Sequence, residues 1–159
     1  MLIFAGFGWG KPVHVNPRNY NRNISVEKAD AIVSIAGPLM NFVLAIIFTL
    51  IYCGMAKFAG GFILTRIGTI IFSLVQYTIL VNIGLGVFNL LPFPPLDGSK
   101  VIMPFLPQNA KQWFLSNEHI FYIVFLILYI TGMAGTIISP IMTAITNGIL
   151  KLGMLIFGL

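Results

Sequence analysis

The sequence predicts an all-α fold: a polytopic membrane helix bundle with three to four transmembrane helices and a Pro-rich extended break at residues 92–98. Three observations lead to this prediction. Of 159 residues, 58% are hydrophobic and only 8% are charged, whereas soluble domains carry roughly 25% charged residues. Three uncharged stretches approach or exceed the about 20 residues that a helix needs to cross a bilayer. Three prolines then follow the second stretch within four positions, where a helix cannot continue.

The predicted spans follow one another along a single membrane-embedded domain, residues 1–159. They are residues 31–52, 69–91 and 120–138. A fourth candidate, 141–159, follows Ser139-Pro140, and we expect a partly inserted helix there because it carries several polar side chains: Thr143, Thr146, Asn147 and Lys151.

The basic residues predict the orientation. Six of the nine lysines and arginines lie in the 11–30 and 92–118 loops, and two lie in the loop between the first two spans. The positive-inside rule then places both richer loops on the cytoplasmic face of the membrane. The basic residues are scattered and are not interleaved with stacking aromatics, so we expect lipid and no nucleic acid as a partner.

Polar and small residues form one stripe on each of the first two spans. Ser34, Gly37, Asn41 and Ala45 share one helical face, as do Thr78, Asn82, Gly86 and Asn89. Helix packing alone explains such stripes, because small residues permit close approach and Asn bonds across the interface. Two stripes on adjacent spans, one of them leading into the Pro-rich break, also fit a shared polar site inside the bundle.

The break reads "NLLPFPPLDG" over residues 89–98. Pro92, Pro94 and Pro95 end the helix and favour extended backbone in the residues before them. Asp97-Gly98 then turns the chain, and Asp97 is the first acidic residue since Asp30. A surface turn at the end of a membrane helix is the simplest interpretation of an isolated Asp-Gly pair.

Three stretches together resemble the site-2 protease family, the intramembrane zinc metalloproteases. Residues 89–98 are similar to its N-x-x-P-x-P-x-L-D-G signature. "GFGWGKPVHVNPRNY" (6–20) resembles the G-W-x-K-P-V-x-V-N-P segment of bacterial members, and "IAGPLMNFVLA" (35–45) resembles the A-G-P-x-x-N helix. The three matches occur in the order in which the family has them.

The resemblance implies hydrolysis of peptide bonds in or near membrane-spanning protein substrates, in a bacterial plasma membrane, with Zn²⁺ as cofactor. It makes Asp97 the third zinc ligand, beside two histidines of an H-E-x-x-H motif whose Glu activates the bound water. Asn89 and Asn41 become active-site or substrate-contacting residues. Gly98 and the prolines (Pro92, Pro94, Pro95) become the residues that shape the segment presenting Asp97.

The sequence departs from the family in one respect, because no H-E-x-x-H occurs in it and no catalytic residue of that motif is present. Its two histidines are His14 and His119. We interpret His14 as an exposed loop residue, and His119 as part of a helix start with Glu118 in the first turn. A new metal site built from both histidines and Asp97 is disfavoured. Cys53, the only cysteine, is expected to be a small buried apolar residue.

We therefore expect an N-terminally incomplete member that lacks the H-E-x-x-H helix and is inactive alone, because one carboxylate leaves most of a zinc shell unfilled. The apolar, glycine-rich residues 1–10 fit the end of a longer segment. Two alternatives stay open. One is a non-catalytic membrane protein that binds a partner helix on the same scaffold. The other is a small transporter component, because broken helices with midplane polar groups also build substrate sites.

Overall fold

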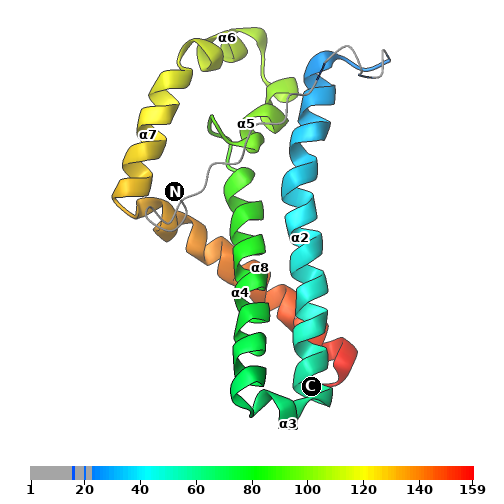
Figure 1. Ribbon diagram of the computed structural model, residues 1–159. Helices are drawn as coiled ribbons and strands as arrows, with labels where there is room; N and C mark the ends of the chain where they lie inside the picture. The colour runs from blue at the N-terminus through cyan, green and yellow to red at the C-terminus, as the bar shows by residue number, and fades with distance from the viewer. Residues whose placement is uncertain (1–15, 17–19, 21–22) are drawn as a thin grey trace.

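The protein is a helical bundle, seen here in a computed structural model that describes residues 16, 20 and 23–159 (Figure 1). No strand occurs in this described part of the chain. The helices, in chain order, are α2 (Val26–Phe58), α3 (Gly60–Ile63), α4 (Arg66–Asn89), α5 (Asp97–Ile102), the 3-10 helix η2 (Met103–Phe105), α6 (Gln108–Ser116), α7 (Glu118–Ile130) and α8 (Met133–Phe157).

Helices α2 and α4 form a long antiparallel pair, joined by the short α3 (Figure 1). The hydroxyl oxygen of Thr65 accepts a hydrogen bond from the N–H of Gly68 at 3.0 Å and so caps the start of α4. Gly68 allows the tight turn before α4, because a Cβ atom there would lie 1.8 Å from the carbonyl oxygen of Phe62. The core between the helices is apolar and includes Ala45, Val75, Ile79, Ile83, Val87 and, from α8, Ile138.

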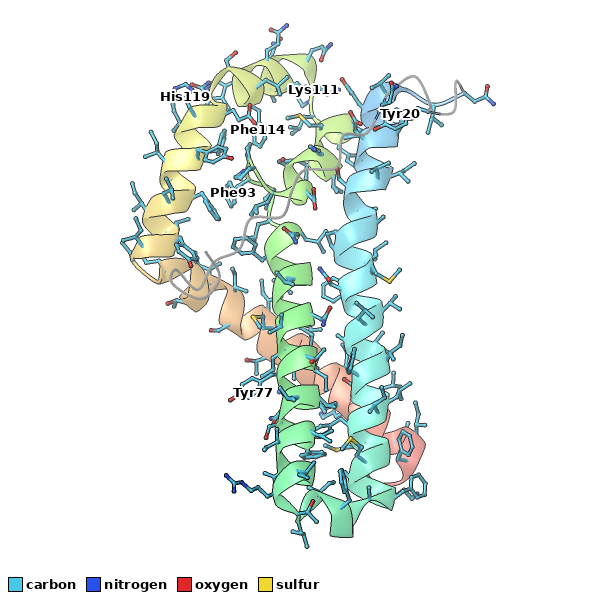
Figure 2. All side chains as sticks on the ribbon, in the orientation of Figure 1. Tyr20, Tyr77, Phe93, Lys111, Phe114 and His119 are labelled. Carbon is cyan, nitrogen blue, oxygen red and sulfur yellow. The ribbon has the colours of Figure 1, made fainter. Side chains whose placement is uncertain are left out.

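Helices α5, η2 and α6 lie at the end of the bundle where α2 begins (Figure 1). Lys111 of α6 forms an ion pair with Glu27 in the first turn of α2, and Figure 2 shows Lys111 on this side of the molecule. The described part of the 11–30 loop and the 92–118 loop therefore share one end of the bundle. Such an exposed ion pair contributes little stability, about 0–1 kcal/mol.

The stretch predicted as a single span over residues 120–138 is divided in the structure. α7 ends at Ile130 and α8 begins at Met133. Between them Gly132 has φ 74, a left-handed conformation that favours glycine and turns the chain between the two helices. Conversely, Pro140 does not separate two segments, since it lies inside α8. The predicted break at Ser139-Pro140 thus falls eight residues earlier, at Gly132.

Three helices are long and apolar enough to cross a membrane: α2, α4 and α8. Helices α6 and α7, bent by 64° at their junction, pass the same test only as a pair, which would make four spans. Large apolar side chains are exposed along the surfaces of α2, α4, α7 and α8. An exposed apolar surface of this extent is expected when the surroundings are lipid rather than water, so the helices are those of an integral membrane protein.

Helix α8 crosses α4 and α2 and packs against both (Figure 1). It approaches α2 closely at Gly153, where a Cβ atom would lie 2.9 Å from Sγ of Cys53 and 3.2 Å from Cγ2 of Thr49. Cys53 is 1% exposed, as the sequence predicts for a small buried residue. Nearby, the ammonium of Lys57 donates a hydrogen bond to the carbonyl oxygen of Phe157 at the end of α8.

We expect Gly153→Leu to lower the free energy of unfolding by about 1–3 kcal/mol, because the added side chain overpacks the contact with Cys53. The measurement is unfolding in mixed micelles followed by circular dichroism. The matched control is Gly135→Leu on the same helix, where a Cβ atom meets nothing within 4 Å and a change within about 0.5 kcal/mol is expected. Equal losses in the two variants would contradict this packing.

A hydrogen bond near the start of α2 joins this helix to the residues before it, since the hydroxyl of Tyr20 donates to Oδ1 of Asp30. This hydrogen bond, followed by desolvation and by the negative charge of Asp30, raises the pKa of Tyr20 above its usual value of 10.0. The folded protein therefore favours the protonated phenol. Its stabilising contribution is present below about pH 10 and is lost as the pH rises through the raised pKa.

We expect an ultraviolet absorbance titration, compared with that of Tyr20→Phe, to show one tyrosine ionising above pH 10. Asp30→Asn should move that pKa back towards the ordinary value, because the charged acceptor is lost. A Tyr20 midpoint that is identical in Asp30→Asn and in the unchanged chain would contradict the role of Asp30.

Candidate active site at the Pro-rich break

The Pro-rich break follows the last residue of α4, Asn89, and runs directly into α5. It is more compact than the extended segment expected over residues 92–98. The N–H of Leu96 donates to the carbonyl oxygen of Phe93 at 2.9 Å, and the peptide bond between Pro94 and Pro95 is cis. Leu96, the residue before α5, has extended backbone, at φ −77 and ψ 153. The turn gives the N–H of Leu96 a carbonyl partner within the break, as buried backbone groups require.

Asp97 is the first residue of α5 and is half-buried. Its carboxylate faces α2, since Oδ2 lies 3.8 Å from the position that a Cβ atom on Gly37 would occupy. Gly37 belongs to the A-G-P-x-x-N stretch and Asp97 to the L-D-G triplet. Two motif-bearing segments that are sixty residues apart in sequence therefore meet at one point, and the absent side chain of Gly37 leaves space beside the carboxylate.

Gly98 determines how closely the start of α5 approaches the end of α4. It is buried, and a Cβ atom on it would lie 2.3 Å from the carbonyl oxygen of Leu90 and 2.4 Å from that of Leu91. The next residue reinforces the turn, because the Ser99 hydroxyl donates to the carbonyl oxygen of Leu96 at 2.6 Å. Of the three prolines, Pro94 is buried, Pro95 is half-buried and Pro92 is exposed. Glycine at position 98 is thus a packing requirement of the site.

Of the two polar stripes, the one on α4 contributes to packing against α2 at Gly86. Gly86 admits the ring of Phe42, whose Cζ would lie 2.8 Å from a Cβ atom there. The amide of Asn82 donates to the carbonyl oxygen of Thr78 in its own helix at 2.8 Å. Asn41 and Asn89 are half-buried, and within the described part of the chain no hydrogen bond joins either of them to Asp97. The structure thus brings Gly37 and Asp97 together but leaves the two asparagines without a direct link to the carboxylate.

The described residues do not complete a metal site around Asp97. Among residues 16, 20 and 23–159, no group of three His, Cys, Asp or Glu side chains lies close enough to hold a metal ion. Glu118 and His119 are exposed at the start of α7, and Figure 2 shows His119 at the outer corner of the bundle. His14 lies outside the described residues. One carboxylate does not meet the need of zinc for three protein ligands and an open position, so Asp97 would need further ligands from outside the described residues to hold zinc.

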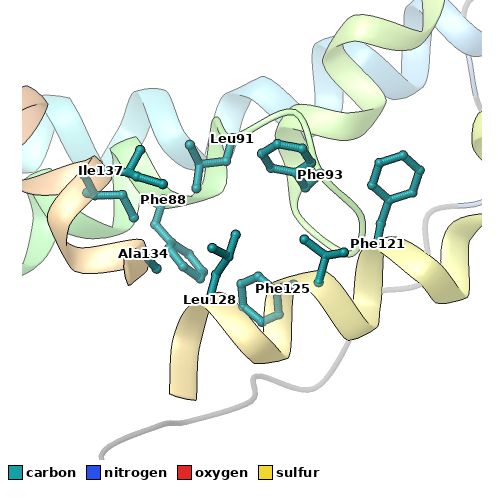
Figure 3. A pocket seen from close by; sticks show the side chains of 10 residues that line it. Phe88, Leu91, Phe93, Phe121, Phe125, Leu128, Ala134 and Ile137 are labelled. Atoms are coloured by element: carbon teal, nitrogen blue, oxygen red, sulfur yellow. The ribbon is translucent and has the colours of Figure 1, made fainter. Parts of the chain in front are cut away.

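An apolar pocket lies on the side of the break that faces α7, and it was not expected from the sequence. Figure 3 shows Leu91 and Phe93 of the break across from Phe121 and Phe125 of α7. The pocket has a volume of about 460 Å³ with its open mouth included, and its lining is apolar throughout. Two aromatic pairs in its lining connect the end of α4 and the break with α7. The ring centroids of Phe88 and Phe125 are 5.6 Å apart, and those of Phe93 and Phe121 are 6.3 Å apart. In the sequence, the aromatic residues spaced along α7 were the feature that could have indicated this pocket.

Comparison with known proteins places the chain in a family. The model of peptidase family M50 matches residues 13–132. A Bacillus subtilis (strain 168) protein named "Putative zinc metalloprotease YwhC" is 34% identical over 157 residues, which cover 99% of this chain and 70% of that protein. A Methanocaldococcus jannaschii protein named "Putative zinc metalloprotease MJ0611" is 39% identical over 70 residues, 44% of this chain and 31% of that protein. No solved structure gives a significant match. The match of the family model across most of the chain, with the Asp97 segment inside it, shows that this protein belongs to peptidase family M50, the site-2 protease family.

Proposed function

We propose that this chain supplies the aspartate half of a zinc-dependent intramembrane protease site, with Asp97 as the ligand it contributes. The observation that carries the proposal is the meeting of Asp97 with Gly37, because it joins the two family motifs of the described chain at a half-buried carboxylate. When bound, zinc would supply a water molecule made nucleophilic at neutral pH. The substrates would be membrane-spanning proteins cleaved within or near the bilayer.

The roles of this chain's own residues follow from where they lie. The prolines and Gly98 hold the start of α5 against the end of α4, which orients Asp97 towards α2. Asn41 lies one helical turn beyond Gly37, and Asn89 is the last residue of α4. We assign both asparagines to the groove that receives the substrate backbone, where an amide can donate and accept hydrogen bonds. Residues 1–159 act as a single membrane-embedded unit.

Because this sequence contains no H-E-x-x-H, the remaining ligands have to come from another segment, and residues 1–159 alone are inactive. We further propose that the chain lies in a bacterial plasma membrane with the 11–30 and 92–118 loops in the cytoplasm. The shared position of α6 and the start of α2, joined by Lys111 and Glu27, supports one common side for these loops. The excess of lysine and arginine there favours the cytoplasmic side.

The test is to purify residues 1–159 in lipid nanodiscs and to measure bound zinc and cleavage of a membrane-spanning model substrate. We expect neither stoichiometric zinc nor cleavage. Stoichiometric zinc accompanied by cleavage, with both abolished by Asp97→Ala, would show that these residues form a complete site and would overturn the proposed inactivity. Glu118→Gln is the matched control, because this exposed carboxylate lies outside the proposed site.

The second candidate is a non-catalytic membrane protein that binds a partner helix on the same scaffold. The absence of a three-ligand group among the described residues favours it. The two candidates separate when a membrane segment carrying H-E-x-x-H is co-expressed with the chain. Zinc binding that depends on both segments supports the protease, whereas association without zinc supports the binding scaffold.

A further inference from the structure

The outer face of α8 carries most of the polar residues of that helix. The opposite face packs on the bundle, through Ile138 and Gly153 and through partly buried neighbours that include Met142, Ile145 and Ile149. An α-helix makes one turn every 3.6 residues, so the residues on the same side of α8 as Thr136 form a separate stripe. All of its members are exposed: Thr136, Pro140, Thr143, Ala144, Asn147, Gly148 and Lys151.

The stripe lies within the depth of the bundle. A Cβ atom on Gly84 of α4 would lie 3.2 Å from Cε of Met142, and one on Gly153 would lie 2.9 Å from Sγ of Cys53 in α2. Asn147 is roughly midway between these two contacts along α8. Since α2, α4 and α8 are the helices suited to cross the membrane, Asn147 faces outward at a depth where lipid tails are expected.

Three polar side chains on the stripe, those of Thr136, Asn147 and Lys151, have no partner in the described part of the chain. The Thr143 hydroxyl is satisfied, because it donates to the carbonyl oxygen of Ser139 at 2.8 Å. The Asn147 amide and the Lys151 ammonium make no hydrogen bond or ion pair with any described residue. An unsatisfied amide in an apolar medium costs several kcal/mol, and ionisable groups within membrane helices normally pair with one another.

Small residues flank the unpartnered amide. Ala144 and Gly148 are four positions apart, the spacing that lets two membrane helices approach closely. A Cβ atom on Gly148 would meet nothing within 4 Å, so this part of the surface is open. A second helix could therefore approach α8 closely at Ala144 and Gly148, next to the Asn147 amide, which could form a hydrogen bond with that helix.

The charges of the chain decide which helix fits. The four acidic residues are Glu27, Asp30, Asp97 and Glu118, and they lie in α2's first turns, in α5 and at the start of α7. The opposite end of the bundle holds Lys57 and Arg66 but no acidic side chain. A second copy of the chain, in the same orientation, would bring another lysine to Lys151 and no carboxylate. We propose that this face of α8 binds a membrane-spanning helix of a different protein, one that carries a carboxylate opposite Lys151.

The test measures resonance energy transfer in phosphatidylcholine vesicles, and it requires no proteolysis. The full chain carries a donor on a cysteine introduced at exposed Gln112, since Cys53 is buried. The acceptor is on a Leu/Ala peptide of about 23 residues, long enough to span the bilayer, with one Glu at the depth of Lys151. We expect this peptide to bind about tenfold more tightly than the same peptide with Leu at that position.

Variants of the chain assign the effect to the stripe. Lys151→Leu should abolish the preference for the Glu peptide, Lys151→Arg should keep it, and Asn147→Leu should weaken binding of both peptides. Leu152→Ala is the control, because Leu152 is exposed on α8 but lies off the stripe. Circular dichroism checks that each variant keeps its helices.

Three results would overturn the proposal. The first is equal binding of the Glu and Leu peptides to the unchanged chain, as expected if lipid phosphates satisfy Lys151. The second is an equal effect of Leu152→Ala and Lys151→Leu. The third is energy transfer between donor- and acceptor-labelled copies of the chain that Asn147→Leu removes, since this would assign the face to a second copy.

Discussion

Asp97→Ala is expected to abolish zinc retention and cleavage when the chain is assayed together with a membrane segment that carries H-E-x-x-H. Removal of one of three protein ligands leaves the metal under-coordinated. Loss of a group that only supports a ligand already costs about 10–100-fold in metal affinity or activity, so loss of the ligand should cost more. The measurements are zinc content after dialysis and the rate of cleavage of a membrane-spanning substrate.

Two further variants separate ligation from packing. Asp97→Asn keeps the size of the side chain but removes its charge, and it should lose most of the zinc. Glu118→Gln removes an exposed carboxylate outside the site and should bind zinc and cleave the substrate as the unchanged chain does. Full zinc retention by Asp97→Ala in a folded protein would show that the ligand lies elsewhere.

The second large effect is expected at Gly98. In Gly98→Ala the new methyl group would lie 2.3 Å from the carbonyl oxygen of Leu90 and 2.4 Å from that of Leu91. Both neighbours are backbone atoms, so the end of α4 or the start of α5 has to move. We expect a loss of about 1–3 kcal/mol in the free energy of unfolding, and a displaced Asp97 with correspondingly lower zinc affinity in the two-segment assay.

Gly61→Ala provides the matched control, because a Cβ atom on Gly61 meets nothing within 4 Å. It should leave zinc affinity unchanged and alter stability by no more than about 0.5 kcal/mol. If Gly98→Ala unfolded with the same free energy as the unchanged chain, the close approach of α5 to α4 would be disproved.

The long apolar helices could be predicted from the sequence because their cause is local. Uncharged stretches of sufficient length predicted the central parts of α2 and α4, and the prolines predicted an end of the second span at residue 91, two residues beyond the last residue of α4, Asn89. The division at Gly132 could not be predicted in the same way, because a single glycine in an apolar run is compatible with a continuous helix. Pro140 suggested a break, yet α8 continues through it.

The candidate site could be predicted only in part, for a different reason. The sequence singled out Asp97 and the helix that contains Gly37 through their motifs, and the structure places the two side by side. The turned shape of residues 92–96 depends on hydrogen bonds such as that from Leu96 to Phe93, which no residue pattern specifies. The apolar pocket depends on how α7 sits against the break, and this follows from the turn at Gly132.

The crossing of α8 over both α2 and α4 has a consequence for the order of assembly during synthesis. α8 is made after the other two helices, and its Ile138 enters the core between them. Before α8 inserts, the pair that aligns Gly37 with Asp97 lacks one of its packing surfaces. A nascent chain stalled before Met133 should therefore hold α2 and α4 less rigidly, and the contact between Gly37 and Asp97 should be fully supported only after α8 has entered the membrane.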